Sequence, residues 1–341
     1  MSDTRSVLQS GLRVQYPILG RRTPGFDVRS KWITAIYDEI RRTIPSELLR
    51  LFFVPVSAAT GWSYRLQMRL LERPDAVTHV TTQMQSFLLR RRPRAPTVIT
   101  CYDLTVPWTL ERLPFADRVI VAARDVGRQL SEAVRLPHDP EVIPLAVPPT
   151  YAPANLPRTT GQILFVGTEQ PRKNVEGLFR IFARVARQTP VTLVKVGARS
   201  SARPRLEALA RELGIDGRLV WKDFVSEGDL VRLYQTSALT VVPSFVEGFS
   251  MPCLEAMAAG CPLIASNLSA IPETVGSGGL LIDPRDEDAW VEGILRSLGD
   301  AAVARELSSR GLRRSTAFSA RASAAETLRV YREVWDDRGH A

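Results

Sequence analysis

The stretch FVEGFSMPCLEAMAAG, residues 245–260, decides the fold of this chain. A strand-like apolar run at residues 239–242 precedes it and a helical pattern follows it, so it predicts a strand entering a helix through a tight turn. Such a turn directs main-chain N–H groups toward one point, which makes it a site for phosphate. Ser250 stands at the N-cap position, and Pro252 falls in the first turn, where its missing N–H costs nothing.

Two glutamates flank this turn eight positions apart, Glu247 on the loop and Glu255 inside the predicted helix. Two carboxylates that bracket a diphosphate suit the hydroxyls of a sugar nucleotide, one reaching the sugar and the other the ribose. In the alternative interpretation, Glu255 is a solvated helix residue and Glu247 an acidic neighbour of the turn. The spacing alone leaves both interpretations open.

A second motif, GTEQPRKN at residues 167–174, follows the strand-like run 163–166 and precedes a helical pattern. The chain has 45 Lys and Arg residues, of which only four are lysines, so Lys173 beside Arg172 is unusual. The planar guanidinium of Arg172 next to the ammonium point charge of Lys173 suits a diphosphate. The alternative, a solvated helix start, is disfavoured because cations oppose the helix dipole at that end. The apolar positions of the following helix are Val175, Leu178, Phe179, Phe182 and Val185.

With both motifs in view, residues 161–336 resemble the nucleotide-binding domain of a retaining glycosyltransferase of the GT-B fold, in glycosyltransferase family 4 (the group 1 glycosyltransferases). Three marks occur in the family's order: GTEQPRKN, WKDFVSEGDL and FVEGFSMPCLEA. Mannosyltransferases are the members that GTEQPRKN resembles most. The resemblance implies an α/β chain of two Rossmann-like parallel-sheet domains that face each other across a cleft.

The resemblance also implies roles for individual residues. Arg172 and Lys173 would hold the diphosphate, and Glu247 would bind the donor sugar's hydroxyls, which makes these three the expected catalytic residues. Glu255 would bind the ribose. Main-chain groups expected at the phosphates, sugar and base are those of Phe249, Ser250, Met251, Phe224 and Val225. The chain departs from the family at Gln170, where relatives often have Glu.

The N-terminal half resembles the family more weakly, at residues 79–83 and 97–104. Gly25 stands where relatives carry a glycine loop that faces the donor, and Tyr102 stands where they usually carry His. A phenol donates a hydrogen bond but supplies no near-neutral base. In retaining GT-B enzymes the departing phosphate is thought to accept the acceptor's proton, so Tyr102 would position the sugar. Asp103 either orients neighbouring groups or caps the following turn.

Strand-like and helical patterns alternate along the chain, which is typical of parallel sheets covered by helices. We predict three segments: an acceptor-side domain (1–157), a nucleotide-sugar domain (158–320) and a C-terminal helix (321–341) that crosses back to the first domain. The proline-rich residues 137–157 are expected to close the first domain. Expected strands are 12–16, 49–56, 76–81, 97–101, 118–121, 163–166, 192–196, 219–221, 239–242, 263–265 and 279–282. Expected helices include 29–42, 62–72, 84–91, 124–134 and 320–335.

Positive charge is concentrated in the N-terminal half. Residues 1–158 hold 22 Lys and Arg against 14 Asp and Glu, which accounts for nearly all of the net charge of +9. Arginine clusters interleaved with aromatic residues suit an anionic membrane surface. An ordinary solvated surface of an arginine-rich protein is the alternative, and nucleic acid is disfavoured because no recognition motif occurs. The residues concerned are Arg21, Arg22, Arg41, Arg42, Arg90, Arg91, Arg92, Arg94, Trp32, Phe52, Phe53 and Trp62.

Composition and residue spacing bear on the domain count, on metal binding and on the location of the protein. The chain of 341 residues has room for two domains, and its three cysteines and three histidines show no metal-ligand spacing. We therefore expect no metal and no cofactor beyond the nucleotide sugar, and we interpret the acidic run at residues 286–288 as an exposed helix start. With no signal-peptide pattern and no apolar run near the ~18 residues of a membrane span, we expect reduced thiols and a cytoplasmic location, peripheral on the inner face of the membrane.

The resemblance, taken with these residues, implies a retaining hexosyltransferase of polysaccharide biosynthesis that works without metal. It would move a sugar from a nucleoside-diphosphate sugar, GDP-mannose first and a UDP-sugar second, to a glycan or polyprenyl-linked acceptor. The alternative is a non-catalytic GT-B subunit that binds a nucleotide sugar or a partner glycosyltransferase. A sugar-nucleotide epimerase could share the fold, but the paired glutamates favour transfer.

Overall fold

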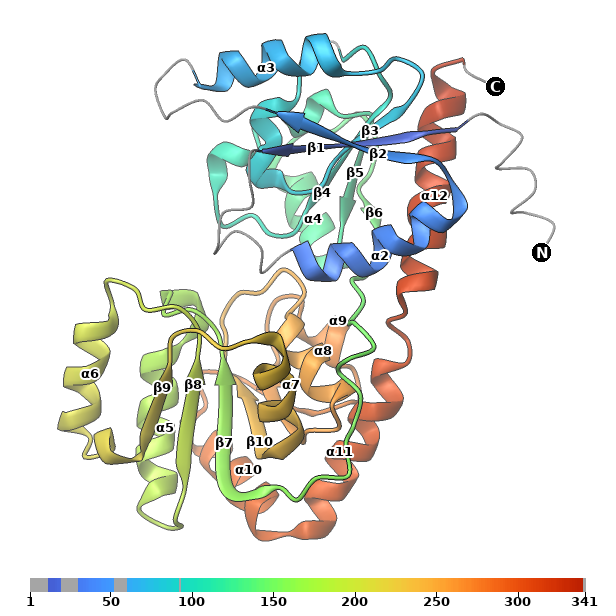
Figure 1. The fold of residues 1–341 in the computed structure, drawn as a ribbon. Helices are drawn as coiled ribbons and strands as arrows, with labels where there is room; N and C mark the ends of the chain where they lie inside the picture. The colour runs from blue at the N-terminus through green and yellow to red at the C-terminus, as the bar shows by residue number, and fades with distance from the viewer. Residues whose placement is uncertain (1–11, 20–29, 52–59, 92, 340–341) are drawn as a thin grey trace. The chain divides into compact units, whose positions relative to one another are not determined.

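The computed structural model describes residues 12–19, 30–51, 60–91 and 93–339 (Figure 1). The chain divides into two compact units, residues 149–317 on one side and residues 1–148 together with 318–341 on the other. Each unit contains one six-stranded sheet in which the paired strands run parallel. The proline-rich residues 149–157, which we had assigned to the first domain, therefore group with the second unit.

The sheet of the first unit has the order β2-β1-β3-β4-β5-β6, with helices on both faces. Its strands are β1 (Val14–Leu19), β2 (Ser46–Leu51), β3 (Val77–Val80), β4 (Thr97–Cys101), β5 (Arg118–Val121) and β6 (Glu141–Val142). Its helices are α2 (Ser30–Thr43), α3 (Thr60–Leu71), α4 (Arg124–Ala133) and α12 (Ala320–Asp337), with 3-10 turns η2 (Gln83–Leu88), η3 (Pro107–Thr109) and η4 (Leu113–Phe115).

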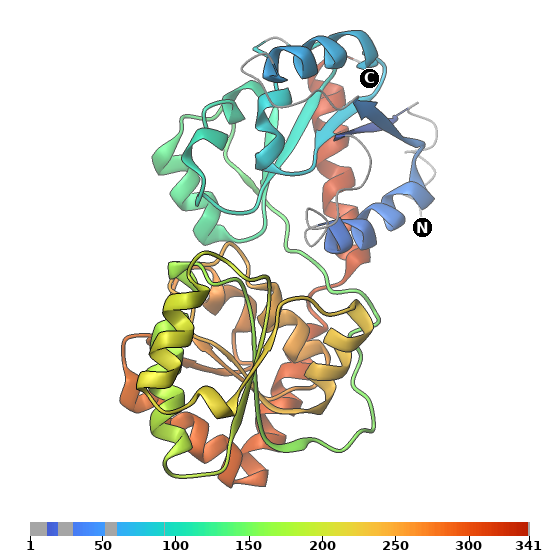
Figure 2. The same ribbon diagram turned by 60° about the vertical axis from the view of Figure 1, so that its left-hand side comes forward.

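The C-terminal helix α12 belongs to this first unit. It packs with α2 against the sheet, and its buried Tyr331 and Val334 share one core with Ile40 of α2 and Val98 of β4. Arg329 also forms a 2.8 Å ion pair with Glu141 of β6. This contact joins residues that are 188 positions apart in the chain, and α12 thereby completes the first unit (Figures 1 and 2).

The predicted helix at residues 84–91 is wrong in type, because the structure has the 3-10 turn η2 there. Thr82 caps this turn by accepting from Met84 N–H, and the backbone is already extended at Leu89. So short a segment gains little from the cooperativity of an α-helix, which makes the tighter turn competitive.

The sheet of the second unit has the order β9-β8-β7-β10-β11-β12. Its strands are β7 (Thr159–Val166), β8 (Thr192–Val196), β9 (Leu219–Lys222), β10 (Ser237–Val242), β11 (Leu263–Ser266) and β12 (Leu280–Ile282). The chain runs outward from β7 to β9 and then returns to the other side of β7 at β10. The loops after β7 and β10 therefore diverge at a topological switch point, the place where open α/β sheets bind ligands.

Helices cover both faces of this sheet (Figure 2). One core contains residues of α5 (Val175–Ala186), α6 (Arg203–Glu212) and α10 (Glu287–Gly299), and the predicted apolar positions of α5 are all buried in it. The other helices are α7 (Glu227–Thr236), α8 (Met251–Ala258), α9 (Ile271–Val275) and α11 (Ala301–Ser315), with 3-10 turns η5 (Pro171–Lys173) and η6 (Asp216–Arg218). Among the helices within the described residues, none is both long and apolar enough to cross a bilayer.

Candidate functional site

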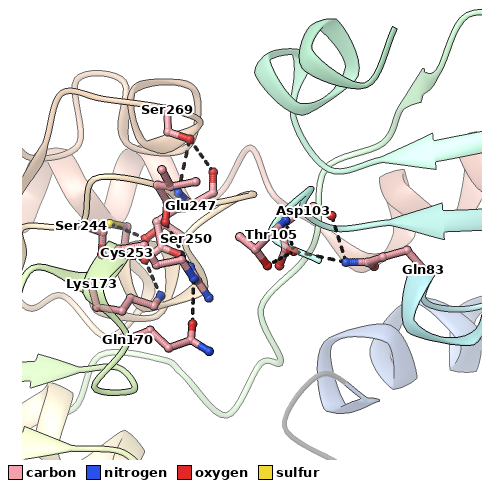
Figure 3. Close-up of polar contacts among 12 residues, drawn as sticks. Gln83, Asp103, Thr105, Gln170, Lys173, Ser244, Glu247, Ser250, Cys253 and Ser269 are labelled. Carbon is pink, nitrogen blue, oxygen red and sulfur yellow. Dashed lines mark hydrogen bonds and ion pairs between the residues drawn. The ribbon is translucent and has the colours of Figure 1, made fainter. Parts of the chain in front are cut away.

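The loops that follow β7 and β10 meet at the switch point of the second unit. The first loop turns through η5 and ends at Asn174, whose φ of 54° is left-handed. The main-chain N–H of Phe245, on the second loop, donates to the carbonyl of Arg172 at 2.7 Å. This bond joins the loops and fixes Lys173 beside the segment that leads into α8 (Figure 3).

A buried ion cluster lies between the two loops. Lys173 Nζ is 2.6 Å from Glu247 Oε1, and Arg172 Nη1 is 3.4 Å from Glu247 Oε2. Ser244 Oγ also donates to Glu247 Oε1 at 2.8 Å. The side chains of Lys173 and Glu247 are 10% and 7% exposed, so this pair is largely removed from water. The structure thus brings together the three residues that we expected to be catalytic.

The main chain of Glu247 is held from a third loop, which follows β11. Ser269 Oγ donates to Glu247 C=O at 2.8 Å, and Glu247 N–H points back to Ser269 Oγ at 3.3 Å (Figure 3). Ser269 has a φ of 58°. Glu247 is therefore anchored through both its side chain and its backbone, which leaves the carboxylate little freedom to move.

Backbone strain gathers around this cluster. Among the described non-glycine residues, positive φ occurs at Asn174, Ser250 and Ser269 alone. Asn174 follows Lys173, Ser250 begins α8, and Ser269 bonds to Glu247. Left-handed conformations of such residues cost of order 1–3 kcal/mol each and persist where surrounding structure demands them, often at functional sites. Their grouping marks this edge of the sheet as the candidate site.

The start of α8 is arranged differently from our expectation. Ser250 occupies the N-cap position and Pro252 the first turn, as predicted, but the Ser250 hydroxyl donates to Cys253 Sγ at 3.1 Å and caps no N–H. No described residue accepts a hydrogen bond from the N–H groups of Ser250 or Met251. These donors lie at the positive end of the helix dipole, an arrangement that favours an anion. Phe249 is buried, and its carbonyl accepts from the Thr274 hydroxyl.

Glu255 is buried, so the interpretation of a solvated helix residue is wrong. Its Oε2 accepts from the Tyr234 hydroxyl at 2.7 Å, and the Tyr151 hydroxyl contacts the same carboxylate. Burial, with the nearby Glu255 charge, raises the pKa of both tyrosines, so both remain protonated donors. One Glu255 oxygen is therefore already engaged, and two tyrosines set the orientation of the carboxylate.

The segment expected at the base lies at the end of β9, two strands from β7 in the sheet order. Val225 is half-buried, whereas Phe224 is 86% exposed. Gln170, the departure from the family pattern, accepts from Arg172 Nε at 2.9 Å. Its amide oxygen thus orients the guanidinium without adding a charge.

The candidate residues Tyr102 and Asp103 belong to the first unit. Asp103 Oδ1 accepts from Thr105 N–H at 3.1 Å and from Thr105 Oγ1 at 2.6 Å, which favours the turn-capping role (Figure 3). Gln83 supports the same turn, since its Oε1 accepts from Tyr102 N–H at 3.1 Å. Tyr102 lines a small cavity together with His79 and other residues. Gly25 lies outside the described residues, as do Trp32, Trp62 and their neighbours in side-chain detail.

The acidic run at residues 286–288 begins a helix, as predicted. Asp286 caps α10 by accepting from Ala289 N–H at 3.0 Å, and Glu287 pairs with Arg180 at 2.8 Å. Among the residues that the structure describes, no three His, Cys, Asp or Glu side chains form a group that could hold a metal ion.

Several residues at the site were not predicted. Ser244 and Ser269 hold Glu247, and Tyr234 and Tyr151 hold Glu255. Ser269 follows β11, so its place at the carboxyl edge of the next strand was available as a signal. No local pattern indicates the tyrosines, since the two approach Glu255 from separate parts of the chain.

Residues 151–314, nearly the whole second unit, match the model of the family described as Glycosyl transferases group 1. The chain is 35% identical over 174 residues to O-antigen chain mannosyltransferase B of Escherichia coli, covering 50% of this chain and 46% of that protein. It is 32% identical over 219 residues to MMP alpha-(1->4)-mannosyltransferase of Mycolicibacterium hassiacum, covering 63% and 53%. The chain thus spans about half the length of these curated relatives.

Solved structures extend the likeness over nearly the whole chain. Sucrose-phosphate synthase from Thermosynechococcus elongatus has a TM-score of 0.78 and 21% identity, covering 96% of this chain and 100% of that one. HepE from Anabaena in complex with UDP-glucose has a TM-score of 0.74 and 17% identity, covering 93% and 99%. Identities this low show the fold alone. The predicted class, α/β with two Rossmann-like parallel-sheet domains of GT-B type, is confirmed.

Proposed function

We propose that this protein is a retaining glycosyltransferase of family 4 that transfers a sugar from a nucleoside-diphosphate sugar to a glycan or polyprenyl-linked acceptor. The observation that carries the proposal is the buried cluster of Arg172, Lys173 and Glu247 at the switch point between β7 and β10. It stands beside the start of α8, whose N–H groups at Ser250 and Met251 have no acceptor among the described residues. Two cations and a helix N-terminus converge where a diphosphate would lie.

The same groups suit the chemistry of transfer. The bond from the sugar's anomeric carbon to the diphosphate oxygen breaks, and the acceptor oxygen bonds to that carbon on the same face. The acceptor's proton passes to the departing phosphate oxygen. Arg172, Lys173 and the α8 N–H groups stabilise the charge that develops on the diphosphate, a contribution of about 3–4 kcal/mol for a single well-placed donor. Glu247 holds the sugar's hydroxyls, and these cations take the place of a metal ion.

The donor proposed first is GDP-mannose, and a UDP-sugar comes second. Two relatives are named as mannosyltransferases, which supports mannose as the first choice. The base is read mainly by main-chain groups near Val225, so the side chains indicate little about its identity.

An anionic membrane surface is proposed as a further partner of the first unit. On α3, Leu66 is 40% exposed and Leu70 is 74% exposed. Arg69 lies exposed on the same helix, and Arg94 donates to its carbonyl at 3.3 Å. Exposed leucines next to arginines suit the interface of an anionic bilayer, where a lipid-linked acceptor would reside.

The deciding experiment measures donor turnover by the purified full chain, with and without a lipid-linked acceptor, across GDP-mannose and a panel of UDP-sugars. Thermal shift with the matching nucleoside diphosphates runs alongside, since a ligand at 100 times its Kd stabilises by about 2.7 kcal/mol. Transfer with retained configuration, unchanged by EDTA, supports the proposal. Nucleotide binding without transfer or hydrolysis would favour the non-catalytic subunit.

A further inference from the structure

A second buried charge network lies next to the candidate site. Glu169 stands on the loop after β7, three residues before Arg172, and its side chain is fully buried. Its Oε1 lies 3.0 Å from Lys195 Nζ and 2.6 Å from Arg203 Nε. Its Oε2 accepts from Ser200 N–H at 2.8 Å and from Ser200 Oγ at 2.9 Å. Burial alone raises the pKa of Glu169, but these hydrogen bonds outweigh it and lower the pKa.

Arg203, the first residue of α6, carries this network to another segment. Its side chain is 3% exposed, and its Nη2 donates to Asp223 Oδ1 at 2.6 Å. Its guanidinium carbon lies 4.0 Å from the ring centroid of Trp221, within range of a cation–π interaction. Asp223 and Trp221 belong to residues 221–225, the segment at the end of β9. One buried guanidinium therefore links the loop of Arg172 to the segment of Val225.

Stability alone does not explain such a network. Desolvating ions is costly, and apolar residues of similar volume often serve the core as well or better. Burial indeed lowers the pKa of Lys195, although Glu169 partly offsets it. The network also lies at the carboxyl ends of β7, β8 and β9, the edge at which the candidate site stands. Its position suits a role in holding the ligand-facing segments in place.

We propose that the Glu169–Arg203–Asp223 bridge positions residues 221–225 and thereby sets which nucleotide base the site accepts. The inference rests on the proposed function, in which the main chain near Val225 receives the base. Main-chain groups distinguish bases by hydrogen-bond pattern, so selectivity requires that their positions be fixed. Glu169 orients Arg203, and Arg203 in turn holds Asp223. These are positioning residues that need not touch the nucleotide.

Asp223→Ala tests the proposal most cleanly, because the Asp223 side chain is 50% exposed and its removal leaves the buried Glu169–Lys195–Arg203 group intact. Asp216→Ala, at an exposed position on the turn before β9, is the matched control. Calorimetry with the full chain would give Kd for GDP, UDP, ADP, CDP and inorganic pyrophosphate. We expect the ratio of Kd between the preferred and next nucleotide to fall at least tenfold in Asp223→Ala, with pyrophosphate binding changed less than twofold. Asp223→Asn, which keeps an acceptor for Arg203, should recover most of the ratio.

An unchanged ratio in Asp223→Ala would overturn the inference. Equal weakening of every nucleotide and of pyrophosphate, together with a lower Tm, would overturn it as well, because it would assign the bridge a purely structural role. If the wild-type chain binds none of the nucleoside diphosphates, the proposed function itself fails. A wild type that binds one nucleotide selectively, together with a variant that stays equally selective, would instead leave the proposed function standing and overturn only the role of the bridge.

Discussion

Lys173 Nζ lies 2.6 Å from Glu247 Oε1 in a setting where both side chains are about nine-tenths buried. A role in binding the diphosphate, taken by itself, predicts that replacing Lys173 costs far more in turnover than in folding. The ion pair changes that expectation, since removing one partner of a buried pair leaves an uncompensated charge.

Lys173→Met is therefore expected to lose turnover at least a hundredfold and to destabilise the protein by about 3 kcal/mol. Arg172 lies 3.4 Å from the other carboxylate oxygen and still offsets part of the Glu247 charge. The loss of folding stability is therefore expected at the lower end of the range for breaking a buried ion pair. The double variant Lys173→Met/Glu247→Gln should recover most of the stability and none of the activity. Urea unfolding and donor turnover separate the two effects, and a single variant with more than a tenth of wild-type turnover would contradict the assignment.

Tyr234→Phe removes the hydroxyl that donates to Glu255 Oε2 at 2.7 Å. A hydrogen bond to a charged group contributes about 1.5–3 kcal/mol, so a measurable drop in Tm is expected.

If Glu255 binds the ribose, Glu255→Gln should weaken the binding of a nucleoside diphosphate about tenfold and leave the binding of its 2′,3′-dideoxy analogue nearly unaffected. Equal weakening of both analogues would mean that Glu255 supports the fold only.

His79 predicts a pH dependence of stability. It is buried between the Tyr331 hydroxyl, at 2.5 Å, and Thr100 Oγ1, at 2.8 Å, and burial lowers its pKa from 6.5 to about 3. Below pH 6.5 His79 is protonated in the unfolded chain but stays neutral in the folded chain. The free energy of unfolding therefore falls as the pH drops from 6.5 toward 3. The slope for one group is about 1.4 kcal/mol per pH unit.

Urea unfolding at pH 7, 6 and 5 would measure this effect against His79→Gln, which has no imidazole to protonate. The wild type should lose about 2 kcal/mol more than the variant between pH 7 and 5. Parallel losses in the two proteins would show that other groups control the acid sensitivity.

The exposed leucines of α3 lead to a binding prediction. Leu66→Ser/Leu70→Ser should reduce co-sedimentation with vesicles containing phosphatidylglycerol severalfold, since these side chains are 40% and 74% exposed and available for insertion. Leu280→Ser, at a 38% exposed position in the second unit, serves as the control. Binding that is equally strong to neutral vesicles, or unaffected by the α3 changes, would remove the membrane from the proposal.

Local pattern alone predicted much of the architecture. Strands β4, β5 and β8 have the predicted bounds, because runs of apolar residues between turn signals depend on nearby sequence. The order of motifs also placed Glu247 on a loop and Glu255 in a helix. Scarcity of lysine pointed to Lys173, and the same signal, followed further, would have indicated Lys195 in its buried network.

Sequence by itself determined the alternating α/β pattern, the two strand-to-helix turns that lead into α5 and α8, and the identity of the charged residues near them. Only the tertiary structure decided that Lys173 pairs with Glu247, 74 positions away, that Tyr234 orients Glu255, and that Arg203 joins Glu169 to Asp223. The reason is physical. Periodicity and turn preference arise from neighbouring residues, whereas an ion pair depends on which loops the strand order brings to the same edge of a sheet.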